Sequence, residues 1–115
     1  MLCFGVLIDD ALGQAREMGK PPVIMWMEME GYEGLTRWGP SSPEVLLDPR
    51  KVSCQRRLEL LILHETGHIL HGHIEQSLPA FVMENIADAW LVHQVEAMRR
   101  DARPCLACFV CRTKG

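Results

Sequence analysis

Two histidines four residues apart, His64 and His68, enclose a glutamate, Glu65, in the segment HETGH at positions 64–68. Side chains at this spacing on an α-helix lie about 40° apart around the axis and one turn along it. Both imidazoles can therefore reach one metal ion. Glu65 flanks that face, so its carboxylate can reach a water on the ion more easily than the ion itself. The spacing predicts a catalytic metal site in which Glu65 takes a proton from that water as general base.

A catalytic zinc site takes three protein ligands and keeps one position for water. The predicted third ligand is Glu84, 16 residues after His68 on the next expected helix. Asp88 follows four residues later on the same helical face, where it can accept the free N–H of a ligating histidine, with His64 the expected partner. The competing interpretation is a solvated pair of carboxylates, but apolar neighbours argue against it. We therefore expect Zn²⁺ bound by His64, His68 and Glu84.

Attack on a carbonyl also requires a hydrogen-bond donor for the oxyanion that forms. Tyr32, His71 and His73 are candidates, and the sequence does not choose among them. His71 also falls on the helical face of the two predicted ligands and would reach the metal if the helix continued straight. Such a residue more often marks a helix end, which leaves Glu84 as the better third ligand.

The elements that must position these residues follow from hydrophobic periodicity and from breakers. Apolar residues recur at helical spacing on both sides of the HETGH segment, and proline precedes and follows the next helical pattern. We expect a helix from about 11 to 18, three strands at 23–30, 35–38 and 44–47, and helices at about 53–71 and 77–100. This order predicts an α+β fold: an N-terminal helix, a small antiparallel sheet, an active-site helix and a glutamate helix.

Length and charge limit the class of protein. A chain of 115 residues suits one domain, expected at 1–104, followed by a short tail at 105–115. The net charge of −3, with dispersed Lys and Arg, gives no reason to expect direct nucleic-acid binding. No apolar run approaches the roughly 18 residues of a membrane span, and the apolar start at 1–8 is too short for a signal peptide. We therefore expect a cytoplasmic protein without a membrane partner.

Three of the five cysteines, Cys105, Cys108 and Cys111, form a CxxCxxC pattern in the tail. Thiolates at this spacing suit soft metals, but a structural zinc site needs a fourth ligand, which only Cys3 or Cys54 could supply. An odd number of cysteines favours reduced thiols over a disulfide framework. We interpret the tail cysteines as packed or free thiols, with a metal or redox sensor as the weaker interpretation.

The HExxH motif followed on the next helix by ExxxD, here Glu84 to Asp88, resembles the gluzincins, the thermolysin-type peptidases. HETGHILHGH at 64–73 and the segment GYEGLTRWGPSSPEVLLDPRKVSCQRRLELLILHE before it resemble the ImmA/IrrE family and minimal single-domain gluzincins. The resemblance spans roughly 23–95. It implies zinc binding by His64, His68 and Glu84, with Glu65 as the catalytic base.

In the ImmA/IrrE family the substrates are often helix-turn-helix repressors, so the resemblance implies such a partner. The predicted function is a zinc-dependent endopeptidase whose protein or peptide substrate lies extended along an exposed strand edge, expected at 44–47. The alternative is a non-catalytic, partner-binding protein on the same scaffold with structural zinc. Glu65 argues for the enzyme, because a scaffold has no need of that base.

Overall fold

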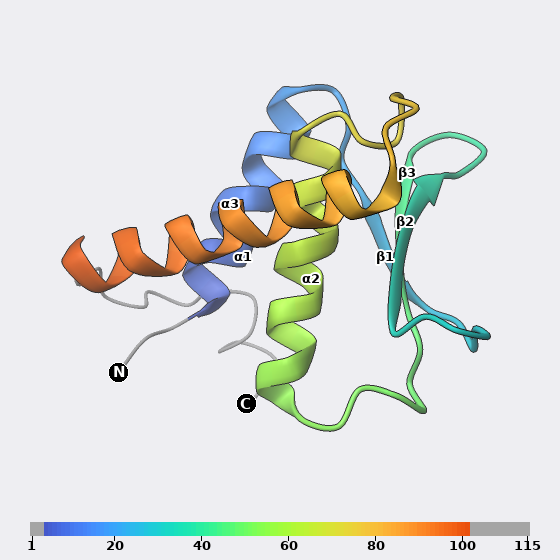
Figure 1. The fold of residues 1–115 in the computed structure, drawn as a ribbon, viewed down its shortest axis with the longest axis horizontal. Coiled ribbons are helices and arrows are strands. Elements are labelled where there is room, and N and C mark those ends of the chain that lie inside the picture. Colours follow the sequence, from blue (N-terminus) through green and yellow to red (C-terminus); the bar gives the residue numbers. More distant parts are fainter. Residues whose placement is uncertain (1–3, 102–115) are drawn as a thin grey trace.

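The computed structural model describes residues 4–101 and confirms the α+β class. Its central element is the helix that carries the HETGH segment, with the other two helices packed against it and the sheet alongside (Figure 1). The predicted domain boundary at 104 and the cysteine tail at 105–115 lie outside the described residues. The elements are α1 (Phe4–Glu17), β1 (Val23–Trp26), β2 (Gly34–Trp38), β3 (Pro43–Leu47), α2 (Gln55–Leu70) and α3 (Ala80–Asp101).

Helix α1 begins at Phe4, seven residues before the predicted start at about 11. The reason lies in the buried stripe of the helix, which recurs at helical spacing from its first residue. That stripe consists of Phe4, Leu7, Ile8, Ala11 and Ala15. Residues 4–8 of the apolar start are therefore part of the helix, and they join the core beneath α2.

The sheet is mixed, with strand order β1-β3-β2, and the prediction of a purely antiparallel sheet was wrong. Strands β2 and β3 form an antiparallel hairpin, whose turn is closed by a bond from the Gly39 N–H to the Ser42 carbonyl. Strand β1 pairs with β3 in parallel, because the chain passes from β1 to the far side of β3 before β2 begins. Consecutive strands often pair, but here β1 and β2 are separated by β3. The segment at 44–47, expected at an edge, is therefore central.

Strand β1 is half as long as the predicted strand at 23–30, because β3 ends at Leu47 and offers no further partner. The chain beyond β1 is held instead by the buried carboxylate of Asp48, which accepts a 2.9 Å hydrogen bond from the Met29 N–H. The guanidinium of Arg50 binds the same carboxylate at 3.0 Å. This cluster anchors the loop that leads into β2, the strand nearest the HETGH segment.

Helix α2 ends in a Schellman motif at its C-terminus. Gly72 adopts φ +70°, which glycine tolerates without strain, and its N–H bonds to the Ile69 carbonyl at 3.0 Å. The N–H of the next residue, His73, bonds back to the His68 carbonyl at 2.9 Å. The turn therefore folds His73 back over His68.

Helix α3 crosses α2 at a steep angle (Figure 1). The two helices approach closely where Gly67 faces Trp90: a Cβ added to this glycine would lie 2.9 Å from the Trp90 ring. Glycine at 67 therefore sets the separation of the two helices that carry the predicted ligands. None of the described helices combines the length and apolarity that a bilayer crossing requires.

Candidate metal centre

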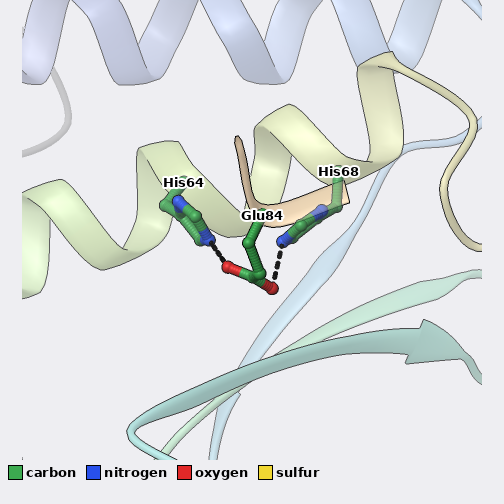
Figure 2. Close-up of side chains that lie close together, drawn as sticks. All are labelled: His64, His68 and Glu84. Carbon is green, nitrogen blue, oxygen red and sulfur yellow. Dashed lines mark hydrogen bonds and ion pairs between the residues drawn. The ribbon is translucent and has the colours of Figure 1, made fainter. Parts of the chain in front are cut away.

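The three predicted metal ligands come together in space. His64 and His68 project from the same side of α2, and the carboxylate of Glu84 reaches between them from α3 (Figure 2). Glu84 Oε2 lies 2.6 Å from His64 Nε2, and Glu84 Oε1 lies 3.2 Å from His68 Nε2. Residues 64 and 68 thus share one helical face, as their spacing predicts, and α3 supplies the third group across the interface.

This donor set fits a metal ion. One nitrogen from each histidine and one oxygen of Glu84 all lie within 4.8 Å of one another. Donors this close can all reach a shared ion at the 2.0–2.2 Å typical of zinc with small side-chain adjustments. Two histidines and one glutamate are the ligand set of one group of catalytic zinc sites, in which a fourth position is left for water.

The second ring nitrogen of each histidine also has a partner. His64 Nδ1 lies 2.9 Å from the Asp88 carboxylate, the contact that the spacing of Glu84 and Asp88 predicts. His68 Nδ1 lies 2.7 Å from the Nδ1 of His73. Outer partners of this kind fix the orientation and tautomer of a ligating imidazole. Both predicted histidine ligands are therefore held at both ring nitrogens.

Glu65 is buried beside the cluster and is held by β2. The hydroxyl of Thr36 donates a hydrogen bond to Glu65 Oε1 at 2.7 Å, and the same hydroxyl lies 3.1 Å from the Glu65 carbonyl. Gly34 lies opposite the carboxylate, where a Cβ would approach Oε2 to 3.3 Å. Strand β2 thus leaves space for the Glu65 side chain and orients it.

Burial shifts the pKa values of this group of side chains. It raises the pKa of the Glu65 carboxyl, an effect opposed by the Thr36 hydrogen bond and by the nearby charge of His64. Burial lowers the pKa of His68, while the carboxylate of Glu84 acts in the opposite direction. A lowered pKa favours the neutral imidazole, which is the form that binds a metal. A raised carboxyl pKa suits a general base, because it increases the affinity for the proton to be transferred.

Two hollows meet at the cluster, and both are lined by Glu65, Glu84 and Tyr32. The larger, here the Arg57 hollow, measures about 640 Å³ and extends toward Arg57 and the leucines of α2. The smaller, the Ile74 hollow, measures about 260 Å³ and is lined by both apolar and polar side chains. A ligand seated over the cluster would therefore extend into a hollow on either side.

The three predicted oxyanion donors lie in different environments. Tyr32 lines both hollows and is more than half exposed. The ring of His71 turns back on its own helix, where Nδ1 lies 2.8 Å from the Gly67 carbonyl, and it lines neither hollow. His73 lines the Ile74 hollow, but its Nδ1 is engaged with His68.

Sequence reasoning missed Thr36 as a partner of Glu65 and His73 as a partner of His68. A threonine in a strand carries no motif, and only the helix-terminating glycine at 72 indicated that residue 73 folds back.

Comparisons of the chain with family models, with curated proteins and with solved structures give no match. The geometry of the site is therefore the main basis for a proposed function.

Proposed function

We propose that this protein is a zinc-dependent metallo-endopeptidase of the gluzincin type, with His64, His68 and Glu84 as metal ligands and Glu65 as general base. The observation that carries the proposal is the placement of Glu65, buried and oriented by Thr36 beside a three-ligand cluster that opens on two hollows. A structural zinc site is closed by four protein ligands and needs no neighbouring base.

Bound at this cluster, zinc would polarise the scissile carbonyl and lower the pKa of a water molecule. The carboxylate of Glu65 takes a proton from the attacking water and delivers it to the departing amine. Thr36 holds one oxygen of that carboxylate, which leaves Oε2 for the proton. Tyr32 is the candidate donor to the oxyanion, because it lines both hollows whereas His71 is turned away.

The substrate of this proposal is an extended segment of a protein, aligned along the free edge of β2. This strand pairs only with β3 among the described residues, and it borders the Ile74 hollow through Leu35 and Thr36. An added strand would gain main-chain hydrogen bonds there. Its side chains would enter the hollows on both sides of Glu65, which supports cleavage within a chain.

A helix-turn-helix repressor is the substrate to test first, because HETGHILHGH at 64–73 resembles the ImmA/IrrE family.

We also propose a cytoplasmic location. The odd number of cysteines and the exposed free thiol of Cys54 support a reducing compartment.

The test compares Glu65→Gln with Glu84→Ala. Glu65→Gln should bind zinc within a few-fold of wild type and lose about 10²–10⁴-fold in peptide hydrolysis, the range for removal of a general base. Glu84→Ala should lose zinc and hydrolysis together. The assay uses zinc-loaded protein with an unfolded, carboxymethylated protein and with a purified helix-turn-helix repressor.

Zinc-loaded wild type that cleaves neither substrate would contradict the enzyme. A repressor that binds equally well to wild type and Glu65→Gln, without cleavage, would favour the alternative of a partner-binding protein.

A further inference from the structure

His73 is a buried histidine outside the predicted ligand set, with 7% of its surface exposed. Two bonds connect it to His68: the backbone N–H of His73 donates to the His68 carbonyl at 2.9 Å, and the two Nδ1 atoms lie 2.7 Å apart. In a Schellman motif these two positions commonly share an apolar contact. Here a pair of imidazoles occupies them, so the motif that ends α2 also provides a hydrogen bond to a predicted metal ligand.

The Nδ1–Nδ1 contact restricts the positions of the hydrogens on both rings. Between two neutral imidazoles this close, one nitrogen donates and the other accepts. Metal binding through His68 Nε2 requires a lone pair there, so the hydrogen of a neutral ring must be on Nδ1. His73 must then accept through Nδ1 and carry its own hydrogen on Nε2.

The arrangement reverses when His68 donates from Nε2 to Glu84, the contact of 3.2 Å. His68 Nδ1 must then accept, and His73 becomes the donor. An imidazole can fill either role, whereas a carboxylate such as Asp88 can only accept. His73 can therefore keep the ring of His68 in place with the metal and without it.

We propose that His73 is a positioning residue that holds the His68 ring and fixes the tautomer presenting Nε2 to the metal. This inference rests on the metal site of the proposed function. It assigns His73 a role different from the oxyanion donor predicted from the sequence, because its Nδ1 already faces His68. Loss of an outer partner of this kind typically weakens metal binding about 10–100-fold.

The test uses two substitutions of His73. In His73→Leu an apolar side chain keeps the contact usual for the motif but removes the hydrogen bond. In His73→Asn the side-chain amide places an oxygen or nitrogen near the position of Nδ1, so a bond to His68 can persist. Zinc affinity is measured by competition with a chromophoric chelator, and thermal unfolding of the zinc-free proteins reports the structural effect.

We expect His73→Leu to bind zinc about 10–100-fold more weakly than wild type, and His73→Asn to recover most of that loss. The apolar contact that leucine makes at this position should offset much of the cost of the unpaired His68 Nδ1, so zinc-free His73→Leu should unfold within a few degrees of wild type. Full zinc affinity in His73→Leu would overturn the inference and leave the metal site standing. Wild type that binds no zinc would overturn both.

A measurement on the wild type alone covers the case in which His73→Leu fails to fold. In ¹⁵N-labelled, zinc-loaded protein, long-range ¹H–¹⁵N spectra should show His68 protonated at Nδ1 and His73 protonated at Nε2. A hydrogen on Nδ1 of His73 in that state would contradict the proposal.

Discussion

The two histidines of the candidate metal centre are held in different ways. His64 depends on a second helix, because its Nδ1 partner, Asp88, lies on α3. The side chain of Asp88 is 65% exposed. His68 depends on its own helix end, because its Nδ1 partner, His73, is buried and is placed by the turn after α2. In the His64 half of the site the outer contact therefore requires correct packing of two helices, whereas in the His68 half it requires only a local turn.

This difference indicates how each half responds to change. A displacement of α3 removes both Asp88 and Glu84 from the site, while the contact between His68 and His73 stays. Water can replace an exposed carboxylate at modest cost, whereas a buried ring nitrogen without a partner is costly. We therefore expect the His64 half to be more sensitive to helix packing and less sensitive to loss of its outer partner.

The largest effect should follow from Gly67→Ala. The new Cβ would lie 2.9 Å from the Trp90 ring, so α3 must shift and carry Glu84 and Asp88 with it. Overpacking costs about 1–3 kcal/mol, offset in part by the roughly 1 kcal/mol that alanine gains over glycine in a helix. Zinc affinity, measured by chelator competition, should fall by at least the roughly 10–100-fold that is expected when a ligating histidine loses its outer partner.

Gly13→Ala is the matched control for this substitution. Gly13 also lies within a helix, but a Cβ there would have no neighbour within 4 Å. It should stabilise the fold by up to about 1 kcal/mol and leave zinc affinity unchanged. A Gly67→Ala protein that binds zinc as tightly as wild type would show that the α2–α3 separation does not position the ligands.

Removal of the outer partner of His64 should have a smaller effect. Asp88→Ala should weaken zinc binding about 10-fold, the low end of the usual range, because water can take the place of the exposed Asp88 carboxylate. The zinc affinity of Asp88→Asn, which keeps an acceptor oxygen, should lie between those of Asp88→Ala and wild type. A greater loss in Asp88→Ala than in His73→Leu would reverse the proposed ranking of the two halves.

Asp48→Asn should have the smallest effect on zinc affinity. Asp48 lies away from both histidines, and its substitution should change the stability of the fold instead. The guanidinium of Arg50, and then the Met29 N–H, hold the pKa of Asp48 well below its usual range. The stabilisation is therefore complete above the unfolded pKa of about 3.9, and it is lost as the pH falls toward the folded value. At pH 7, zinc-free Asp48→Asn should unfold about 5 °C or more below wild type, with unchanged zinc affinity in the folded protein.

This difference in unfolding temperature should begin to shrink as the pH falls below about 4, because Asp48 then binds a proton in the unfolded chain while it stays ionised in the folded protein. The exposed carboxylate of Glu96 provides the control, since Glu96→Gln should show little difference at any of these pH values. A deficit in Asp48→Asn that stays constant down to pH 3 would contradict an ionic role for Asp48.

Periodicity and spacing predicted much of the His64 half. Helix α2 lies within two residues of its predicted bounds, Glu84 lies beside both histidines, and Asp88 contacts His64 as expected. Regular helices make this possible, because residues four apart must share a face. The contacts that the sequence did not reveal depend on how separate elements approach one another. The parallel pairing of β1 with β3 depends on the path of a loop. The hydrogen bond from Thr36 to Glu65 depends on how closely β2 approaches α2.

We propose one zinc ion that is shared by α2 and α3, beside a base that does not bind it. The most direct measurement is anomalous diffraction at the zinc edge, from crystals grown with one equivalent of zinc. We predict a single ion at about 2.0–2.2 Å from His64 Nε2, His68 Nε2 and a Glu84 oxygen, with the Glu65 carboxylate outside coordination distance. Zinc bound elsewhere in the chain, or none at these three residues, would contradict the proposed metal site.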